Sequence, residues 1–456
     1  MRFLGIGESN DLAALYQGLS VRGHEVRVFI EEPACHDVFG GMLERVPDWR
    51  AQLDWVRQAG PEGIIVFESA TKGAEQDALR REGFQVIGGS EFGDRLEADR
   101  EFGQSMLRQS GLLTAQSHGF TDYGDALAFL QRLGGRYVLK FNGADSPRTR
   151  NYVGQLDDAG DMMALLGMYA ARAGDTRPDF VLMEFIQGVE VGIGAYFNGQ
   201  DFLAPACMDF EHKRFFPGEL GELTGEMGTI VSYRDSARLF NATLKPLAGA
   251  LADSAYCGYI NLNLMVNALG VWPLEFTSRF GYPGFAICEA LQQDPWEVIF
   301  KRMIDRSRLD FRTRSGYAAG VVLTVPPFPY PQGYAELSKG EPICFMPGTT
   351  DAERESLHFA EVAEVAGQLV TSGNSGYIAV ATGVGATVRK ASRQAYRVAS
   401  KLVVPNLRYR NDIGERVAAH DLHALQTLGW IDGPQPVADE LLTARRRSPT
   451  TVVAHL

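Results

Sequence analysis

Two strands predicted at residues 258–266 and 271–277 carry an unusual polar face. Alternate residues of a strand point to the same side, so one face of the pair collects Asn261, Asn263, Glu275 and Thr277. The other face of the second strand would pack Trp272, Leu274 and Phe276 on the core. Oxygen ligands of this kind suit Mg²⁺, which keeps several waters and takes few protein carboxylates. A solvated sheet face is the alternative interpretation, although such faces usually mix Lys, Glu and Thr.

Cationic side chains stand at the ends of predicted strands, where they could hold phosphate or carboxylate groups. Lys140 ends an apolar strand at residues 137–141, and Arg279 ends the second strand of the polar pair. A lysine in such a place holds a nucleotide phosphate as a point charge, but it can equally be solvated. Residues 211–214 (EHKR) precede a glycine-rich loop at 218–228, which suits an anion clamp under a mobile lid. A plain surface loop is the alternative.

Two further segments suggest contacts with a nucleotide or an anion. Gly5 and Gly7 lie at a strand-to-helix junction, where backbone N–H groups and the helix dipole favour an anion. The loop lacks the last glycine of a dinucleotide fingerprint, because Asn10 stands there, so a nicotinamide oxidoreductase is only a weak alternative. The apolar strand at residues 180–185 could present its backbone to an adenine edge, and Glu190 could accept from ribose hydroxyls.

The composition limits the classes of partner. The chain has 456 residues, and its 44 Lys and Arg against 56 Asp and Glu give a net charge of −12. This balance argues against nucleic-acid and anionic-membrane partners, and no run approaches the ~20 apolar residues of a membrane helix. The five Cys are odd in number and lack a C-x-x-C pair, which argues against a disulfide framework or structural zinc. We therefore expect a cytoplasmic protein that handles small molecules.

The pattern of elements divides the chain into three expected domains and a loosely ordered tail. The divisions are residues 1–95, 96–312, 313–431 and 432–456. The first region alternates strands with helices, which predicts a parallel sheet. The second opens with a helix at 96–110 and then carries antiparallel strands, among them a hairpin of 190–198 and 201–209 turned by Asn198 and Gly199. The predicted fold class is therefore α/β followed by α+β.

Six motifs occur in the order in which one enzyme family carries them. They are residues 181–190, 211–214 (EHKR), 221–228 (GELTGEMG), 274–283 (LEFTSRFGYP), 383–396 and 409–414 (YRNDIG). No single motif would suffice, but their common order identifies a resemblance. Over residues 2–420 the chain resembles phosphoribosylamine–glycine ligases, also called glycinamide ribonucleotide synthetases, of the ATP-grasp superfamily.

The resemblance implies a fold and an activity. The fold would be an N-terminal preATP-grasp domain of Rossmann-like type, an ATP-grasp domain of two subdomains and a C-terminal α+β domain. The activity would be that of an ADP-forming carboxylate–amine ligase, in which ATP phosphorylates a carboxylate and an amine attacks the acyl phosphate. The cofactors would be ATP and Mg²⁺, with Mn²⁺ possible, and the partners a small-molecule acid and amine, without nucleic acid or membrane. The enzyme would be a cytoplasmic monomer or homodimer.

Family roles then fall on matching positions of this chain. Nucleotide phosphates would meet Arg100 and Lys140, the adenine would meet Met183, Glu184, Phe185 and Ile186, and the ribose would meet Glu190. Glu275 would be the magnesium carboxylate, with Asn263 and Thr277 beside it. The catalytic cations Arg279, Lys213 and Arg214 would stabilise charge that develops in the reaction. The substrates would contact Gly5, Gly7, Thr224, Gly225 and Glu226, with the two N-terminal glycines binding the phosphate of the amine.

Several positions depart from the family pattern. Thr277 replaces a metal-site Asn, Glu226 replaces a glycine of the substrate loop, and residues 8–11 lack an expected Arg and His. Residues 143–150 contain Pro and two Arg where Gly and Lys are expected. Because the ATP half is kept better than the acceptor half, we expect substrates other than phosphoribosylamine and glycine. The same departures leave a catalytically inactive nucleotide- or metabolite-binding paralogue as the alternative.

Overall fold

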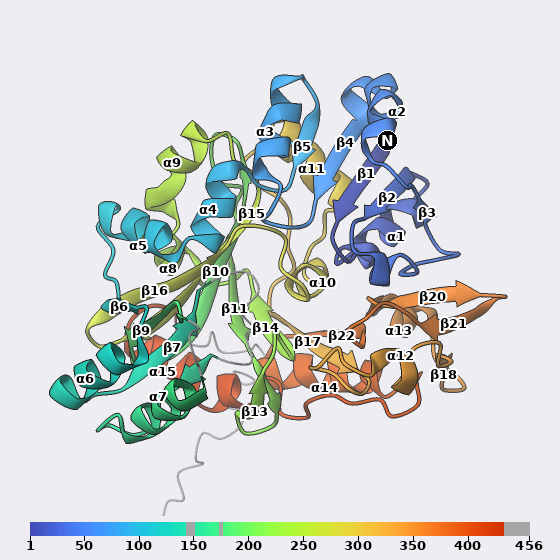
Figure 1. Cartoon of the computed structure of the whole chain (residues 1–456). Coiled ribbons are helices and arrows are strands. Elements are labelled where there is room, and N and C mark those ends of the chain that lie inside the picture. Colours follow the sequence, from blue (N-terminus) through green and yellow to red (C-terminus); the bar gives the residue numbers. More distant parts are fainter. Residues whose placement is uncertain (143–150, 173–176, 433–456) are drawn as a thin grey trace, which may run out of the picture.

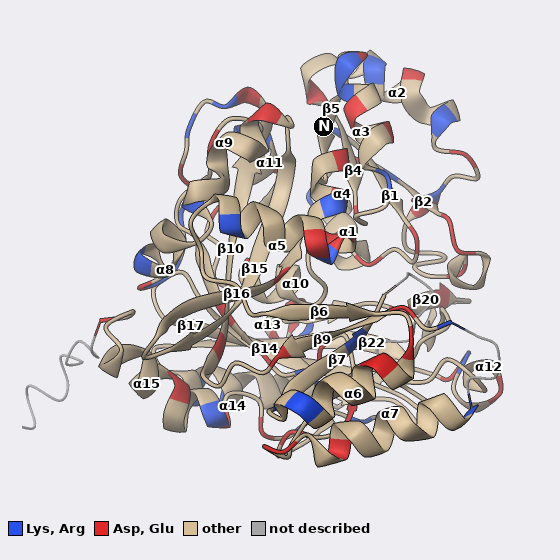
Figure 2. Ribbon diagram, turned by 60° about the vertical axis from the view of Figure 1, so that its left-hand side comes forward, with Lys and Arg blue, Asp and Glu red and all other residues tan. Residues whose placement is uncertain are grey.

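The computed structural model describes residues 1–142, 151–172 and 177–432 (Figure 1). The sequence-based expectations for the loop at 143–150 and for the tail beyond residue 432 therefore lie outside the described residues. Within the described ranges, no helix is long and apolar enough to cross a membrane. Acidic and basic positions are scattered over many helices and loops rather than gathered on one element (Figure 2).

A five-stranded parallel sheet forms the N-terminal part of the chain, in the order β3-β2-β1-β4-β5. Its strands are β1 (Arg2–Gly7), β2 (Glu25–Ile30), β3 (Glu44–Arg45), β4 (Gly63–Phe67) and β5 (Gln85–Ile87). The helices that lie between them in sequence are α1 (Ala13–Val21), α2 (Leu53–Gln58) and α3 (Gly73–Arg81). The predicted parallel sheet is confirmed, and its central strands β1 and β4 are buried on both faces, as parallel strands usually are.

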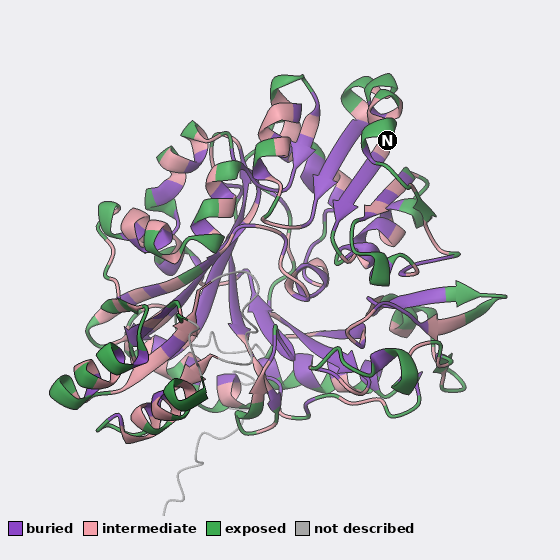
Figure 3. Ribbon diagram, in the orientation of Figure 1, coloured by how far each residue is buried: buried purple, intermediate pink, exposed green. Residues whose placement is uncertain are grey.

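An eight-stranded antiparallel sheet occupies the middle of the molecule, in the order β16-β15-β10-β11-β14-β17-β22-β19. Its strands are β10 (Val189–Asn198), β11 (Cys207–Glu211), β14 (Gly228–Ser232), β15 (Cys257–Asn267), β16 (Gly270–Thr277), β17 (Tyr317–Thr324), β19 (Leu357–Phe359) and β22 (Tyr377–Gly385). Long stretches of these strands are buried (Figure 3). The domain boundary expected between residues 312 and 313 falls between two strands of this one sheet, so strands from both sides of the boundary belong to it. The division into domains remains a proposal.

A four-stranded antiparallel sheet with the order β6-β9-β7-β8 lies beside the large sheet (Figure 1). Its strands are β6 (Ser117–Phe120), β7 (Tyr137–Phe141), β8 (Tyr152–Val153) and β9 (Phe180–Glu184). Helices α6 (Tyr123–Leu133) and α7 (Gly160–Arg172) pack on it through a core that contains Leu139, Phe180 and Leu182. This small sheet carries Lys140 toward the polar face of β15 and β16.

The remaining elements connect or flank these sheets. The helices are α4 (Glu91–Ala98), α5 (Arg100–Gln109), α8 (Ala237–Ala242), α9 (Ala248–Asp253), α10 (Gly284–Glu289), α11 (Trp296–Asp305), α12 (Tyr334–Leu337), α13 (Asp351–Glu355), α14 (Val388–Ala399) and α15 (Leu422–Thr427). The short strands are β12 (Arg214–Phe216), β13 (Leu220–Leu223), β18 (Cys344–Phe345), β20 (Val362–Val365), β21 (Gln368–Thr371) and β23 (Leu402–Val403). Together the parallel and antiparallel sheets confirm the predicted fold class of α/β followed by α+β.

The faces of β16 correct one expectation. Asn263 pairs with Glu275, whereas the next residue, Leu264, pairs with Pro273, so Leu274 is an extra residue in a β-bulge. N-terminal to the bulge, the residues of β16 that face the core are therefore the other set of alternate residues. Val271 and Pro273 are buried, as is Phe276, whereas Trp272 and Leu274 are only half-buried. The predicted apolar face of Trp272, Leu274 and Phe276 was therefore wrong. The predicted polar face was right, since Asn261 stands opposite Thr277 and Asn263 opposite Glu275.

Two local predictions also differ from the structure. The helix expected over residues 96–110 is two helices, α4 and α5, because Asp99 has an extended backbone and its side chain accepts from the Phe102 N–H as the N-cap of α5. The hairpin after β10 turns near Asn198, whose side-chain oxygen accepts from the Gln200 and Asp201 N–H groups. Its second strand begins only at Cys207, so the strand expected at 201–209 was too early.

Candidate active site

A cleft lies over the polar face of β15 and β16, where the large sheet meets the N-terminal region. It is lined by Asp209 and Glu211 of β11, Asn261 and Asn263 of β15, Glu275 and Thr277 of β16, and by Asp11, Lys213, Gly225, Glu226, Arg279, Tyr282 and Tyr377 among others. Asn261 and Asn263 are buried, at 8% and 7% exposure, so this face is the floor of a cleft and not a solvated surface.

Lys140 and Glu275 meet across two different sheets. Lys140 Nζ lies 3.2 Å from Glu275 Oε2, with Lys140 on the small sheet and Glu275 on the large one. Arg100, the first residue of α5, donates through Nη1 to Asn142 Oδ1 at 3.1 Å, just beyond the strand that carries Lys140. Burial lowers the pKa of Arg100, and the negative charge of Glu275 opposes this shift. The structure therefore groups Arg100 and Lys140 around one carboxylate.

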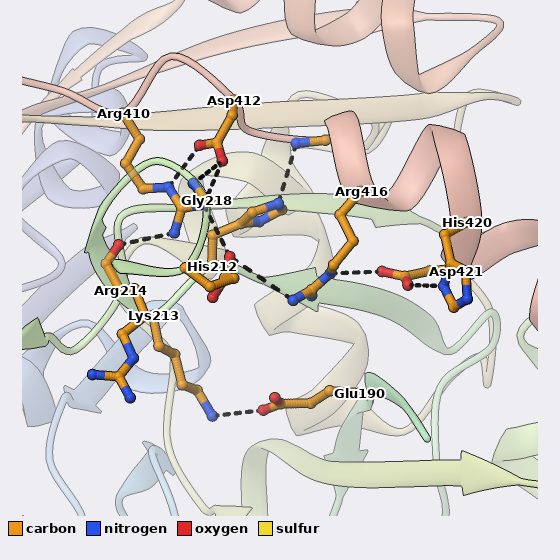
Figure 4. Close-up of polar contacts among 12 residues, drawn as sticks. Glu190, His212, Lys213, Arg214, Gly218, Arg410, Asp412, Arg416, His420 and Asp421 are labelled. Atoms are coloured by element: carbon orange, nitrogen blue, oxygen red, sulfur yellow. Dashed lines mark hydrogen bonds and ion pairs between the residues drawn. The ribbon is translucent and has the colours of Figure 1, made fainter. Parts of the chain in front are cut away.

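Lys213 joins three carboxylates in the same region. Its Nζ lies 3.1 Å from Glu190 Oε1, 3.1 Å from Glu211 Oε2 and 3.5 Å from Glu275 Oε1. Figure 4 shows the Lys213 side chain directed at Glu190. Burial alone would lower the pKa of Lys213, but Glu211, Glu190 and Glu275 raise it well above its usual value. Lys213 therefore stays charged in the cleft and holds the positions of acidic groups from β10, β11 and β16.

Strand β11 contributes two acids, Asp209 and Glu211, that the sequence analysis did not assign to the site. Asn261 Nδ2 donates to Asp209 Oδ2 at 2.9 Å, and Asn263 Nδ2 donates to Glu211 Oε2 at 3.2 Å. Burial, and then the charge of Glu211, raises the pKa of Asp209 well above its usual range. The signal for both acids was their i, i+2 spacing on an apolar strand that leads into the EHKR motif, of which Glu211 is the first residue.

The carboxylates of the cleft fit a divalent cation that arrives with a nucleotide. Among the residues that the structure describes, no three His, Cys, Asp or Glu side chains are placed to hold a metal ion together. Glu211 and Glu275 nevertheless approach one point, since Lys213 Nζ contacts both. Two carboxylates completed by water and substrate phosphates are a typical Mg²⁺ environment. The donor set therefore suits magnesium bound with a nucleotide better than a metal cage built by the protein alone.

Arg279 lies at the other end of the polar face and is held by Glu97 of α4. Its Nε donates to Glu97 Oε1 at 3.1 Å, and the Ser278 N–H donates to Glu97 Oε2 at 2.7 Å. Burial would lower the pKa of Arg279, but the charges of Glu97 and Asp11 outweigh burial and raise it. The guanidinium is thus fixed and charged at the edge of the cleft, where it could bind a carboxylate or a phosphoryl group. Glu97 was another residue that the sequence analysis missed.

Arg214 and Thr224 shape the loop between β11 and β14 instead of lining the cleft with their polar groups. Arg214 Nη1 donates to the Gly221 carbonyl at 2.7 Å across the β12–β13 hairpin, and Thr224 Oγ1 donates to the Lys213 carbonyl at 2.8 Å. Arg214 is not among the lining residues of the cleft, whereas Gly225 and Glu226 are. The structure thus brings together Lys213, Gly225 and Glu226 but directs Arg214 into the hairpin.

A buried network ties this loop to the C-terminal region (Figure 4). Arg410 is 1% exposed and donates to Asp412, to Glu219 Oε1 and to the Arg214 carbonyl. His212 is buried beside it, and burial with the charges of Arg416 and Arg410 lowers its pKa to about 4. Its Nδ1 pairs with the Gly228 carbonyl, and its Nε2 accepts from the Gly414 N–H. His212 is therefore a neutral structural group at neutral pH rather than part of an anion clamp.

The segment expected to meet adenine runs out of β9 along the small sheet. Met183 is buried, Phe185 and Ile186 are half-buried, and Glu184 is exposed. The Phe185 N–H donates to the Arg136 carbonyl at 3.0 Å, and the Arg136 guanidinium lies 3.8 Å over the Phe185 ring. The segment is thus fixed in place near Glu190, whose carboxylate is held by Lys213.

Gly5 and Gly7 have a packing reason to be glycine. A Cβ on Gly5 would lie 2.4 Å from the Tyr16 ring, and a Cβ on Gly7 would lie 2.3 Å from Glu68 Oε2. Burial, and then the charge of Asp11, raises the pKa of Glu68 to about 8. The Leu12 N–H at the start of α1 points at Glu68 Oε2, 3.4 Å away. The Glu68 carboxyl group therefore lies beside this backbone N–H group, at the place where the sequence predicted a bound anion.

A second cavity opens next to the cleft and shares Asp11, Tyr282 and Tyr377 with it. Its other lining residues are Ser9, Asn10, Ala360, Glu361, Asn374 and Ser375, so the N-terminal region forms one wall and the C-terminal region the opposite wall. Residues 360–377 were not assigned to a site from the sequence, because their position opposite the β1–α1 loop depends on how distant parts of the chain pack.

Two families of sequences match long stretches of the chain. Residues 98–285 match the family described as phosphoribosylglycinamide synthetase, ATP-grasp (A) domain, and residues 318–416 match phosphoribosylglycinamide synthetase, C domain. The phosphoribosylamine–glycine ligase of Pseudomonas aeruginosa is 29% identical over 392 residues, which cover 83% of this chain and 87% of that protein. These matches lie in the same order as the motifs quoted above.

Solved structures share the fold. The phosphoribosylamine–glycine ligase of Thermotoga maritima superposes with a TM-score of 0.67 at 22% identity, covering 91% of this chain and all 100% of that chain. The biotin carboxylase domain of the 2-oxoglutarate carboxylase of Hydrogenobacter thermophilus, solved with MgADP and bicarbonate, gives a TM-score of 0.61 at 12% identity and covers 95% of this chain and 99% of that chain. At these identities the likeness establishes the ATP-grasp fold.

Proposed function

The chain belongs to the phosphoribosylglycinamide synthetase family of ATP-grasp carbon–nitrogen ligases, and from this premise we propose that it joins a carboxylate to an amine through an acyl phosphate. The observation that carries the proposal is the meeting of Lys140 and Glu275 across two sheets at 3.2 Å, with Lys213 beside them. A cation and a carboxylate so arranged can grip opposite ends of a metal-bound triphosphate.

The proposed reaction has two steps. A carboxylate oxygen of the acid attacks the γ-phosphorus of ATP, the bond from that phosphorus to the bridging oxygen breaks, and ADP leaves. The ammonium group of the amine then loses one proton to water, and its nitrogen attacks the acyl carbon. The carbon–oxygen bond to phosphate breaks, and inorganic phosphate leaves as the nitrogen loses a second proton to water. Arg279 is suited to bind the acid and the acyl phosphate, since its charge faces the cleft while Glu97 fixes its direction.

The chain's own residues have distinct proposed roles in the first step. Arg100 and Lys140 bind nucleotide phosphates, and Lys213 neutralises charge on the transferring phosphoryl group. Glu275 and Glu211, with Asn263 and Thr277 on the same face, hold the divalent ion, for which Mg²⁺ is proposed and Mn²⁺ is the substitute. That ion would draw electron density from the phosphoryl oxygens. The segment from Met183 to Ile186 carries the adenine, and Glu190 carries the ribose.

The acid and the amine are proposed to differ from glycine and phosphoribosylamine. Glu226 stands in the substrate loop, and acidic residues surround the β1–α1 loop where a phosphate was expected. Thr224, Gly225 and Glu226 remain the proposed substrate loop, with Thr224 shaping its backbone. The proposed setting is the cytoplasm, which agrees with five free cysteines.

Trapping of the acyl phosphate with hydroxylamine tests the function without knowledge of the amine. The full chain is incubated with ATP, Mg²⁺ and a broad panel of carboxylic acids, with and without hydroxylamine, and ADP and hydroxamate are measured. We expect at least one acid to release ADP and to give a hydroxamate in equal amount, and the Glu275→Ala variant to give neither. Mass spectrometry of products formed in a cell extract would then identify the natural pair.

The opposite result has a definite meaning. If the chain binds MgATP by calorimetry but forms neither ADP nor hydroxamate with any acid of the panel, the ligase proposal is wrong. The chain would then be a nucleotide-binding member of the family without ligase activity, which Thr277 and the altered residues 143–150 allow.

A further inference from the structure

The second cavity contains acidic and neutral side chains and no cationic one. None of the described residues that line it is Lys, Arg or His, whereas Asp11 and Glu361 are among them. The main cleft adds Glu226 at the junction, and its cations, Lys213 and Arg279, are each held by carboxylates. A phosphate group in the second cavity would therefore meet carboxylates without a cation from the lining residues.

Two buried side chains at this junction have polar atoms without a partner in the structure. Glu226 is 6% exposed and its Oε1 has no hydrogen-bond partner. Asn10 is 2% exposed, and both Oδ1 and Nδ2 of its amide have none. A buried polar atom without a partner costs about 1–3 kcal/mol, so these atoms need a partner from water or from a ligand. Glu226 lines the main cleft and Asn10 lines the second cavity.

Asn10 is also held in a backbone conformation that side chains seldom adopt. Its φ is +67°, in the left-handed region, two residues before Leu12, the N-cap of α1. Asn is one of the few residues that tolerate this region, and strain of this kind gathers at binding sites. The conformation keeps the Asn10 amide in the wall of the second cavity and leaves the neighbouring Asp11 side chain exposed.

Three acids surround a pair of tyrosine rings at the junction of the two cavities. The Tyr282 and Tyr377 rings lie 5.3 Å apart between centroids. Burial raises the pKa of both phenols, and the charges of Asp11, Glu226 and Glu361 add to the shift of each. Aromatic faces next to carboxylates attract an organic cation both through the ring quadrupole and through the negative charge.

We propose that the second cavity and its junction with the cleft bind the amine substrate as a cation that carries no phosphate group. Asp11 and Glu226 contact the ammonium group, Asn10 hydrogen bonds to the body of the molecule, and the two tyrosine rings enclose it. This inference rests on the proposed function, because it assigns the amine that attacks the acyl phosphate. Arg279 lines the main cleft but not the second cavity and remains available for the acid, so the acid and the amine each meet a group of opposite charge before they react.

Glu361 supports the wall of this site rather than contacting the amine. Its carboxylate accepts from the Ser375 N–H and from the Gly376 N–H, at 2.9 Å and 2.7 Å, and from Ser375 Oγ at 2.8 Å. Burial nevertheless raises its pKa, because these hydrogen bonds only partly offset the cost of burying the carboxylate. Burial also raises the pKa of Glu226, and an ammonium ion beside Glu226 would reverse that shift.

Matched amines test the inference by binding alone. The full chain with MgADP is titrated with glucosamine, glucosamine 6-phosphate and N-acetylglucosamine, and with ethanolamine and O-phosphoethanolamine, by saturation-transfer NMR. We expect each unphosphorylated amine to bind at least about tenfold more tightly than its phosphate ester, and the uncharged N-acetyl compound to bind about tenfold more weakly than glucosamine.

Variants assign the charge selection to residues. Glu226→Gln is expected to weaken binding of glucosamine about tenfold and to leave N-acetylglucosamine unchanged. Asp11→Asn, at an exposed position that does not threaten folding, is expected to act in the same direction. Glu364→Gln, an exposed carboxylate on β20 outside both cavities, is the matched control and should change neither affinity.

Several outcomes would overturn the proposal. Equal or tighter binding of the phosphate esters, unchanged affinity in both Glu226→Gln and Asp11→Asn, or no binding of any amine up to about 50 mM would each do so. The proposed ligase activity fails by a different result, the absence of hydroxamate. A chain that forms hydroxamate but prefers the phosphorylated amines would therefore keep the ligase function and lose this inference.

Discussion

The two halves of the cleft differ in how their charges are balanced. In the ATP half, Lys140 and Lys213 contact Glu190, Glu211 and Glu275, and the charge of Glu275 also acts on Arg100, so three cations face three carboxylates within the protein. In the acceptor half, Asp11 and Glu226 lie near Arg279, which is already paired with Glu97. The carboxylates of the first half are held by cations of the protein, whereas no described cation forms an ion pair with Asp11 or Glu226 in the second half.

This difference says what each ligand must bring. In the proposed function, a metal-bound triphosphate would exchange one set of ion pairs for another, since the metal would bind the carboxylates and the phosphates would bind the lysines. The acceptor half has no such set of ion pairs to exchange. Because a buried carboxylate without a cation is unfavourable, this half would be stabilised by a ligand with a positive charge. The proposed function therefore assigns a ligand of mixed charge to the ATP half and a cation to the acceptor half.

The largest expected effect on activity comes from removing charged side chains of the ATP half. Lys140→Ala and Glu275→Ala should each lower ADP formation by roughly 10²- to 10³-fold or more, because each removes one end of the grip on the triphosphate. The fold should persist, since Glu275 has a side-chain exposure of 47% and the other core contacts of β7 and β16 remain. ADP release and thermal unfolding are the measurements.

Lys245→Ala provides the matched control for these variants. Lys245 also forms a lysine–carboxylate pair, with Asp201 at 2.6 Å, but neither residue lines the cleft. Its activity should stay within about twofold of wild type, since exposed pairs of this kind contribute little. A Lys140→Ala or Glu275→Ala enzyme with the wild-type rate would show that the ion pair has no part in phosphoryl transfer.

The next effect falls on the loop that serves both halves. Residues 211–228 carry Lys213 for the ATP half and Glu226 for the acceptor half, and Arg410 anchors the loop to the C-terminal region. Arg410→Leu leaves buried acceptors and the carboxylates of Glu219 and Asp412 without their cation, so unfolding in urea should become easier by about 3 kcal/mol.

Arg308→Ala tests whether burial makes that difference. Arg308 pairs with Asp310 at 2.9 Å, but the two side chains are 63% and 58% exposed, so loss of this pair should cost less than about 1 kcal/mol. Arg410→Leu is also expected to lower the affinity for MgATP and for amines together. Equal destabilisation by the two variants would contradict a special role for the buried arginine.

The polar face of the ATP half could be predicted because strand alternation is a local property. Asn261 and Asn263 repeat every second residue within one strand, and their neighbours on β16 follow after a tight turn. The bulge at Leu274 could not be read in the same way, because it exists only in the register between β15 and β16. The fold class was similarly accessible, since alternating strands and helices predict a parallel sheet wherever they occur.

The acceptor half was harder to predict because its residues come together from distant segments. Asp11 and Glu361 belong to opposite walls of one cavity but lie far apart in the sequence. The local backbone pattern at Gly5–Gly7 predicted an anion site. In the structure, the carboxyl group of Glu68, which follows β4, occupies the adjacent space. Which side chain fills a loop depends on tertiary packing, and this information is absent from a local motif.

The stability of the fold should depend on pH through Glu68, an acid that is buried next to the acceptor half. Its pKa rises from 4.5 to about 8 in the fold, so between these values the folded chain keeps a proton that the unfolded chain releases. Stability contributed by this group is therefore lost as pH rises through that window, by at most about 1.4 kcal/mol per pH unit. Glu68→Gln should remove this part of the pH dependence.

Urea unfolding of wild type and Glu68→Gln at about pH 5.5 and about pH 7.5 measures the effect. The wild type should lose about 1–2 kcal/mol more than the variant between the two values. Glu364→Gln, at an exposed position, should follow the wild type. Parallel curves for wild type and Glu68→Gln would show that Glu68 is ionised in the folded chain.

The smallest expected effect concerns the metal within the ATP half. Thr277 stands on the same face as Glu275 and opposite Asn261, so an amide in its place would add an oxygen ligand next to the carboxylate. Thr277→Asn should lower the Mg²⁺ concentration for half-maximal ADP release about threefold, and Thr277→Val, which keeps the shape and removes the oxygen, should raise it about threefold. Equal magnesium requirements in all three enzymes would place the ion away from β16. Opposite shifts would show that one more oxygen ligand strengthens metal binding in this half. The carboxylates there already form ion pairs with Lys140 and Lys213, which limits what they alone can offer the metal.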